Sequence, residues 1–562
     1  MLLGLLWIDA AVAQSVDPIE NARIEAVRIT VVNPGPDAQR NARVEDAVRR
    51  ALGVFPSSTF VPASFELVLA KARRTPNVAS LDYETSFGST GGVVLTVSVT
   101  LGEVGAVATP RGMLAPGGKA ADFPVLYDSN GTYIKLKAEA LGIHYGNADA
   151  WYGRPDVMLA GNPLVDGKPS GKGYKQWVEG FVQAGIYGIT PVTDTFHLYG
   201  GVSVLASASA GRELFTDRTR AHVAVEDAYA GFVTGTTTGK GNRIVFNASI
   251  GRQRYKIGDG FLIINTSANG GDRAALQSNP RWAVDMLALA QLRYNNMQLE
   301  VFHLDPDELP VVDSRTKING VNFDARVAPG LDIGLTYLHV PKSTFGYYTP
   351  TQSFTREGLS VYDARFRWQP NPAGLAGPFF SGEYGIQRNS NFRMRASAMA
   401  AEAGYAFAKA PWSPTISYRY ARFTGDDIDT PTFERWDPLL SGGNGEQWVQ
   451  GINHFKIFQN SNMIAHRFQL RARPSPKLEL VPQFWIFRAD SLTNLGGNPA
   501  LSFLPSRDLG TEVNLTGKVF VSRNIYVQGH VAVTFPGDGA KAAIAGPQHS
   551  WLSTMLFVRV AY

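Results

Sequence analysis

The sequence predicts a mostly β fold, in which a transmembrane antiparallel β-barrel of about 16–18 strands follows a small N-terminal α/β module. Three observations lead to this prediction. Apolar and polar side chains alternate over stretches of about ten residues, repeatedly, from residue 131 to residue 562. The connections between these stretches alternate between short turns and long polar loops. No apolar run is long enough for a transmembrane helix, and a closed barrel is the other fold that satisfies its backbone in lipid.

The overall composition excludes several classes of protein. The 562 residues include 53 Lys and Arg against 48 Asp and Glu, so there is no dominant basic field for nucleic acid. The absence of cysteine excludes disulfides and thiolate metal sites. The chain also lacks G-x-S-x-G, H-E-x-x-H and P-loop motifs. We therefore expect neither an enzyme nor a bound cofactor.

Residues 1–13 have the features of a signal peptide. A short apolar run precedes Ala11-Val12-Ala13, which has the small-residue form of a cleavage site before Gln14. The usual basic start is missing, so we expect the true initiator to lie upstream of Met1. The alternative is a disordered apolar tail. If the signal is real, the protein is exported.

Residues 20–103 differ in pattern from the rest of the chain. Strand-like alternation at 24–33 and 91–102 flanks two stretches, 41–53 and 60–76, with apolar residues at helical spacing. The predicted order is strand, helix, helix, strand, strand, which makes a small α/β domain. The Pro-, Gly- and Ala-rich residues 104–130 are then a linker or an entry into the first strand.

Alternation near the carboxyl terminus shows how a strand divides its side chains. In residues 551–562, Leu556 and Val558 share one almost wholly apolar face, whereas Arg559 lies on the other. We expect this last strand to pair with the first, near 132–145, and so to close the barrel. The terminal aromatic Tyr562 resembles the signal that the barrel-assembly machinery recognises.

The same reasoning assigns eight arginines to the lumen, because their alternating neighbours are apolar and must face lipid. They are Arg365, Arg367, Arg393, Arg395, Arg467, Arg471, Arg473 and Arg559. Guanidinium groups stay charged and hold carboxylates with two hydrogen bonds, so a series of them favours passage of anions. The alternative is that acids such as Asp363 and Glu479 pair with them and brace the wall. The faces of Arg252 and Arg254 depend on whether Gly251 forms a bulge.

Two stretches resemble the alginate-export family of outer-membrane porins: FNASIGRQRYKIGDGFLI at 246–263 and YRYARFTGDDIDTPTFERWDPLLSGG at 418–443. Matching positions are Gly251, Arg252, Gln253, Gly425, Asp426, Asp427, Asp437 and Pro438, while Ile428 replaces the family's usual proline. The resemblance implies a barrel of approximately 18 strands. In the best-known members it also implies an arginine-lined pore for an anionic polysaccharide. A general diffusion porin is also consistent with it.

The N-terminal pattern resembles a POTRA (polypeptide-transport-associated) module. Such modules bind other proteins along a sheet edge, which implies a periplasmic partner for residues 20–103. The rival interpretation is a polypeptide transporter of the two-partner-secretion class. Its characteristic Val-Arg-Gly-aromatic motif is absent, since the pair Arg111-Gly112 is followed by Met.

The acidic stretch from Thr424 could be a metal site or an ordinary outward loop. Asp426, Asp427 and Asp429 offer the several oxygens that Ca²⁺ prefers, although their spacing is not that of an EF-hand. The stretch 424–453 could also fold inward and plug the pore.

Overall fold

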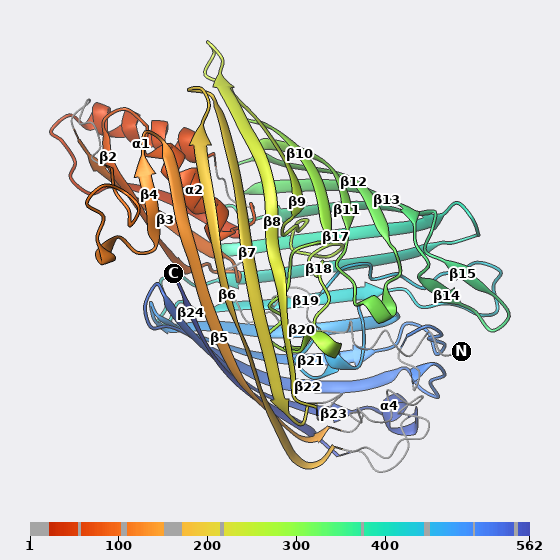
Figure 1. The fold of residues 1–562 in the computed structure, drawn as a ribbon. Helices are drawn as coiled ribbons and strands as arrows, with labels where there is room; N and C mark the ends of the chain where they lie inside the picture. Colours follow the sequence, from red (N-terminus) through yellow and green to blue (C-terminus); the bar gives the residue numbers. More distant parts are fainter. Residues whose placement is uncertain are drawn as a thin grey trace.

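A closed barrel makes up most of the molecule, and a small α/β module lies at one of its ends (Figure 1). The structure, a computed structural model, describes residues 22–53, 58–102, 110–150, 171–213, 218–371, 376–442, 450–497, 501–543 and 549–562. Among these residues, no helix is long and apolar enough to cross a membrane.

Eighteen described strands form the barrel wall, each antiparallel to the next, which agrees with the predicted fold. They are β5 (Thr132–Ala150), β6 (Gly171–Pro191), β7 (Phe196–Gly211), β8 (Arg220–Thr237), β9 (Arg243–Arg252), β10 (Met286–Tyr294), β11 (Met297–Asp305), β12 (Lys317–Ala328), β13 (Leu331–Lys342), β16 (Leu359–Trp368), β17 (Gly377–Asn389), β18 (Ala396–Ala406), β19 (Thr415–Phe423), β20 (Met463–Ser475), β21 (Leu478–Arg488), β22 (Asp508–Phe520), β23 (Ile525–Pro536) and β24 (Trp551–Ala561).

The first and last strands of the wall close the barrel, as the sequence predicts. Strand β24 pairs with β5 in an unbroken register from Leu552 opposite Ala148 to Ala561 opposite Glu139. Below this seam, β4 (Val125–Ser129) continues the pairing along the start of β5. Within residues 104–130, β4 is therefore part of the sheet, as an entry into the first strand and not as a linker.

The two faces of each strand carry the side chains that alternation assigns to them. On β24, Leu556 and Val558 are exposed on the outer face, whereas Met555 and Phe557 are buried inside. Trp368 and Tyr418 also lie outside, where rim aromatics are expected. Trp485 is an exception: it is 1 % exposed and lies in the lumen, because it shares the inward face of β21 with Glu479 and Phe487.

The module has its own sheet and its own core. It contains β1 (Ile24–Val31), α1 (Ala38–Leu52), α2 (Pro62–Ala72), β2 (Val78–Phe87) and β3 (Val93–Leu101). The sheet order is β1-β3-β2, with β1 parallel and β2 antiparallel to the central β3. Side chains such as Val48, Leu95 and Val97 form the core between the helices and the sheet. The relationship to POTRA modules stays a prediction.

Local sequence signals account for the ends of α1. Asp37 caps its N-terminus by accepting hydrogen bonds from the backbone N–H groups of Gln39 and Arg40. Gly53 ends the helix in the left-handed conformation, with φ of 59°.

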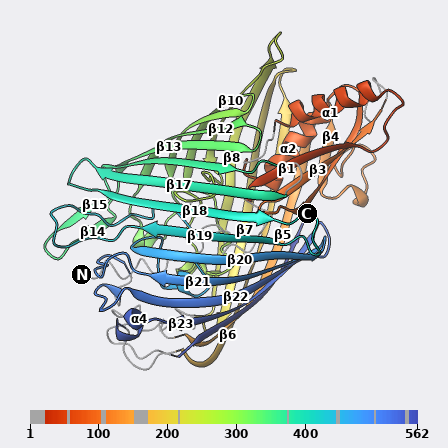
Figure 2. The ribbon, with the colours of Figure 1, turned by 180° about the vertical axis from the view of Figure 1, so that it is seen from behind.

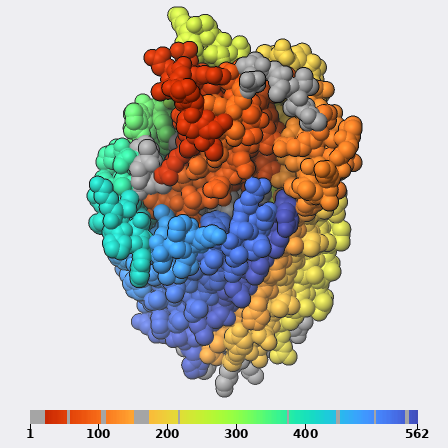
Figure 3. Space-filling model, turned by 90° about the vertical axis from the view of Figure 1, so that its left-hand side faces the viewer, coloured from red at the N-terminus to blue at the C-terminus, as the bar shows by residue number. Residues whose placement is uncertain are grey.

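The two ends of the barrel differ. The module and the carboxyl terminus lie at the end that carries the shorter turns, and the loop with the hairpin β14 (Gly346–Tyr348) and β15 (Ser353–Thr355) lies at the other (Figures 1 and 2). The short helix α4 (Asp538–Ala543) lies at that other end too (Figure 2). In a view from this end of the barrel, the surface of the module lies among the ends of the barrel strands (Figure 3).

The outward face of β24 provides a test of how the barrel sits in the bilayer. We expect Leu556→Arg, at the middle of the strand, to lower the free energy of unfolding by about 2–4 kcal/mol. Val560→Arg, on the same face but near the strand's end, should cost only about 0–1 kcal/mol. Urea titration of the protein in lipid vesicles measures both. If the two variants lost equal free energy of unfolding, Leu556 would not lie deeper in the membrane than Val560, and the predicted membrane span would be wrong.

Candidate functional site

Cationic side chains gather on the inner face of neighbouring strands. Within the described residues of β16–β22, the inward positions hold seven cations and five carboxylates. The cations are Arg365, Arg367, Arg419, Arg467, Arg471, Arg473 and Lys518, and the carboxylates are Asp363, Glu383, Glu402, Glu479 and Glu512. We call these seven the basic row.

Carboxylates from the same wall pair with most of this row. Arg365 contacts Asp324 on β12 at 2.6 Å and Asp363 at 3.3 Å. Arg467 contacts Glu402 at 2.7 Å. These pairs neutralise buried charge and brace the wall, as the alternative interpretation requires.

Three further cations of the basic row share one carboxylate. Arg471 and Arg473 both lie 3.0 Å from Glu479, and Lys518 lies 3.5 Å from it. Three cations around one carboxylate leave local positive charge. Outside the row, Arg559 pairs with Glu139 across the seam at 2.8 Å.

Two of the predicted lumen arginines lie elsewhere. Arg393 and Arg395 are exposed in the loop between β17 and β18, and they share the parity of the outward Met399. The prediction failed because β18 begins only at Ala396, and its inward positions are Ala398, Ala400 and Glu402.

Two members of the row were not predicted. Arg419 lies between the aromatic Tyr418 and Tyr420, so alternation alone places it inside, and it lies 5.4 Å from the Trp485 ring centroid. Lys518 is flanked by Gly517 and Val519, a weak pattern in which only the pairing with β21 decides the face.

The segment 253–285, between β9 and β10, folds back into the lumen. Its side chains Ile257, Phe261 and Ile263 are buried in the main core of the barrel. Gly251, at a φ of 124°, ends the alternation of β9, and a Cβ there would collide with the Ala228 carbonyl oxygen. This backbone turn settles the open question of Arg252, which leaves the lipid face and joins a polar network.

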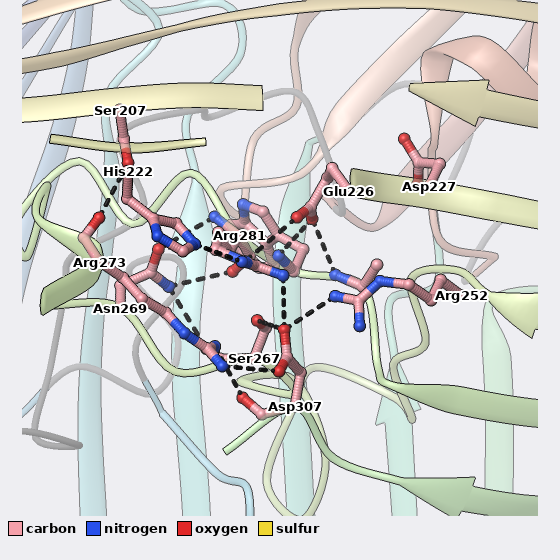
Figure 4. A network of polar contacts seen from close by, with 12 residues as sticks. Ser207, His222, Glu226, Asp227, Arg252, Ser267, Asn269, Arg273, Arg281 and Asp307 are labelled. Carbon is pink, nitrogen blue, oxygen red and sulfur yellow. Dashed lines mark hydrogen bonds and ion pairs between the residues drawn. The ribbon is translucent and has the colours of Figure 1, made fainter. Parts of the chain in front are cut away.

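That network centres on the Asp307 carboxylate (Figure 4). Arg281, Arg252 and Arg273 approach it to 2.6, 2.8 and 2.9 Å respectively. Arg281 also lies 3.6 Å from Glu226 on β8. Two of these arginines belong to the inward segment, so the network fastens that segment to the wall. Gln253 adds a hydrogen bond from the Ser249 hydroxyl at 3.1 Å.

The acidic stretch of residues 424–442 is held by one buried carboxylate. Arg356 donates two hydrogen bonds to Asp437, at 2.7 and 2.9 Å, and the Tyr347 hydroxyl donates a third. Burial raises the pKa of Asp437, but Arg356 and these hydrogen bonds outweigh it and keep the pKa below its usual value. The next residue, Pro438, accepts a hydrogen bond from the Ser441 N–H group.

The other carboxylates of this stretch serve the backbone. Asp426 accepts from the N–H group of Glu434 at 2.8 Å, and Asp427 from that of Asp429 at 3.1 Å. Gly425 leaves no room for a side chain beside Asn462. Across the described residues, no three His, Asp or Glu side chains form a group that could hold a metal ion. The calcium site at Asp426, Asp427 and Asp429 stays a prediction without support from this arrangement.

Residues 450–462 also lie inside the barrel. Glu512 on β22 accepts hydrogen bonds from the backbone N–H groups of Ile452, Asn453 and His454. Lys456 lies 4.1 Å from the Tyr145 ring centroid, and burial lowers its pKa to about 7. The predicted plug at 424–453 thus falls partly on this inward segment, while residues 443–449 lie outside the described part of the chain.

Residues 202–549, more than half of the 562-residue chain, match the model of the alginate export family. The chain belongs to the alginate-export family. Membership makes it a transport protein of the outer membrane. The family-matching residues in the stretches 246–263 and 418–443 mainly fasten inward or outer loops. They do not line the basic row.

Solved structures that match the chain include the following two. OmpF of Salmonella typhi, in complex with daunomycin, is 12 % identical with a TM-score of 0.36. OccK5 (OpdH) of Pseudomonas aeruginosa is 9 % identical with a TM-score of 0.45. In each case 76 % of this chain and 97 % of the other chain are covered. No protein with a curated description matches the chain.

The Asp437 contacts predict how the outer loops respond to mutation. Asp437→Asn leaves the Arg356 charge buried without a carboxylate, so we expect local stability to fall by about 3–5 kcal/mol. Limited proteolysis of the purified protein should then cut the outer loops 344–357 and 424–442 much faster. Asp427→Asn is the matched control, because Asp427 is exposed and contacts only backbone nearby. Equal cleavage of the two variants would contradict the anchoring role.

The same contacts predict a pH dependence. The pKa of Asp437 is lowered in the folded protein, so its contribution is full above the usual carboxyl pKa and is lost as pH falls through the lowered value. Proteolysis of the wild-type outer loops, measured with an acid-active protease, should accelerate at low pH. Asp437→Asn should abolish this acceleration.

Proposed function

We propose that the barrel passes an anionic solute or an alginate-like polysaccharide across the outer membrane. The observation that carries this proposal is the excess of cationic side chains on the inner face of β16–β22, seven against five carboxylates. A narrow, low-dielectric lumen with such an excess concentrates anions and repels cations.

The acid partners of the row are compatible with transport. Arg471, Arg473 and Lys518 share a single carboxylate, Glu479, so this group keeps a net positive charge that attracts a solute carboxylate. Guanidinium groups bind carboxylates with two parallel hydrogen bonds, and several sites in series let a ligand pass from one to the next. The paired acids limit how tightly any one site holds the solute.

The orientation follows from the loops. We place the module's end in the periplasm, because outer-membrane barrels have their short turns there and their long loops outside. In that orientation, residues 20–103 face periplasmic proteins, one of which we propose as a partner. Insertion by the barrel-assembly machinery through Tyr562 belongs to the same proposal.

Ion selectivity tests the proposed function. In planar bilayers under a KCl gradient, the purified protein should show a reversal potential that favours anions. Replacing Arg467, Arg471 and Arg473 by Glu should weaken or reverse it, because all three face the lumen from β20. The preference should shrink at 1 M salt, where the screening length is about 3 Å.

Arg393→Glu with Arg395→Glu is the matched control, because these arginines are exposed in a loop and should leave the selectivity unchanged. A wild-type pore that prefers cations would contradict the proposal. Block of the current by polygalacturonate would favour a polysaccharide exporter, whereas unhindered chloride flow in its presence would favour a general diffusion porin.

A further inference from the structure

The N-terminal module contacts the barrel around much of its circumference. On one side, Glu66 pairs with Lys135 on β5 and Arg73 lies 3.1 Å from Asp128 on β4. The Phe87 ring lies 4.5 Å from the Phe520 ring on β22, which is three strands from β5. On the opposite side of the barrel, Arg367 on β16 donates a hydrogen bond to the Thr90 hydroxyl of the module. Contacts with such widely separated strands place the module across the mouth rather than beside it (Figure 3).

Backbone carbonyl groups of the module meet further arginines of the wall. Arg293 on β10 donates to the carbonyl oxygen of Gly53. Arg243 on β9 donates to that of Ala51 at 3.3 Å. The end of α1 is thus held by cations, which are favourable at a helix C-terminus.

The turn between β2 and β3, residues 88–92, reaches the basic row itself. Arg473 donates to the carbonyl oxygen of Gly88, and Arg367 donates to the Thr90 hydroxyl. Gly91 lies so near that a Cβ there would stand 2.8 Å from Nη2 of Arg471. The turn therefore occupies space and hydrogen-bond donors along the same arginines that the solute would use.

A buried carboxylate shapes this turn. Glu25 accepts hydrogen bonds from the N–H groups of Thr90 and Gly92, at 2.9 and 2.7 Å, and from the Thr90 hydroxyl at 2.6 Å. Burial raises the pKa of Glu25, but the nearby Arg23 and Arg367 outweigh it, so the pKa lies below its usual value. The module thus brings its own ionised carboxylate to the row.

The module also meets the inward segment 253–285, which comes from the opposite end. Arg23 lies 3.9 Å from Asp259, which is in that segment. A cavity of about 410 Å³ remains between the module and the wall, and one of about 100 Å³ remains beside Arg23, Thr90, Asp259 and Arg367. Among the described residues, the module and the inward segment thus cover the row from both ends.

The module is built so that it can separate from the wall. Its core, around Val48, Leu95 and Val97, is distinct from the barrel core. Among the described residues, its apolar contacts with the wall include Phe87 with Phe520, and Leu67 with Tyr133 and Ile189. Its contacts with Lys135, Arg243, Arg293, Arg367 and Arg473 are polar and would be hydrated on release.

We propose that the N-terminal module is a displaceable plug of the periplasmic mouth, whose turn 88–92, organised by Glu25, stands in for the carboxylate groups of the solute on the basic row. This inference rests on the proposed passage of anions. An anionic solute that enters from the periplasm competes for Arg367, Arg471 and Arg473, and it replaces the turn's contacts with its own. The closed pore thus keeps the basic row occupied. It opens for part of the time without the solute, and the solute prolongs the open state.

Cross-linking the plug tests this proposal in the full-length protein. The chain has no cysteine, so Phe87→Cys with Phe520→Cys introduces a single pair at facing positions. A short, reducible bifunctional thiol reagent should link the pair and abolish the conductance in planar bilayers. A reducing agent should restore it. Each single-cysteine variant, treated in the same way, should conduct like untreated protein.

Persistent conductance in protein that mass analysis shows to be fully linked would overturn the proposal. The reduced channel tests the proposed function separately. If it conducts but prefers cations, anion transport is wrong while the plug stands. If the linked channel conducts with an anion preference, the plug is wrong while the function stands.

A second variant covers the case in which neither the linked nor the reduced channel conducts. Gly91→Ala places a Cβ against Arg471, so it should raise the open probability several-fold. Gly117→Ala is the matched control: its φ of 79° is also positive, but nothing lies within 4 Å of the added Cβ. A closed Gly91→Ala channel, or equal open probabilities for the two variants, would overturn the proposal.

Displacement of the turn by a polyanion has its own readout. Polygalacturonate added on the module's side should increase the labelling of Thr90→Cys by a charged thiosulfonate reagent, because it displaces the turn. Neutral dextran of similar length should not. Equal labelling with both polymers would show that the turn does not stand in for a carboxylate.

Discussion

Every backbone N–H and C=O group that faces lipid must find its partner within the protein, and the rest of this structure follows from that requirement. An open sheet would leave two unpaired edges, so the first and last strands must meet. They do so between β5 and β24, over ten consecutive residue pairs from Leu552 to Ala561. Once the ring is closed, each strand has one face toward lipid and one toward the lumen, and charge can lie only on the second.

Closure creates a new constraint inside the barrel. Charged side chains that lipid excludes are crowded together on the inner face, where an unpaired charge is costly. The structure meets this cost with carboxylates from neighbouring strands, as for Arg467 with Glu402. It also uses segments that fold into the lumen, as for Arg252 and Arg281 around Asp307. The basic row is therefore both a set of braces for the wall and the positive surface that we propose for transport.

The same crowding explains why segments from both ends enter the lumen. The segment 253–285 brings Arg273 and Arg281 to an acid that follows β11, and residues 450–462 bring backbone N–H groups to Glu512. The module brings carbonyl oxygens to Arg293 and Arg473. In each case, a hydrogen-bonding or charged group from the entering segment meets a complementary group of the barrel.

Particular residues show how far alternation could predict the site. It placed Arg365, Arg367, Arg467, Arg471, Arg473 and Arg559 inside correctly, because each has apolar neighbours within an established strand. It failed for Arg393 and Arg395, which precede the first residue of β18, where period-two reasoning does not apply. Trp485 shows another limit, because an aromatic residue fits a lipid-facing girdle and a packed lumen equally well, and only the structure places it inside.

The sequence by itself determined the barrel, its closure and the face of most strand residues, because these depend on a period of two that is read locally. It also gave Gly251 and Asp437 as positions that match the family, but it did not show that one turns a segment inward or that the other meets Arg356, which follows a distant hairpin. Only the tertiary structure decided which acids pair with the row, and where the module lies. These depend on strands far apart in the chain that become neighbours once the ring is closed, and no local pattern carries that information.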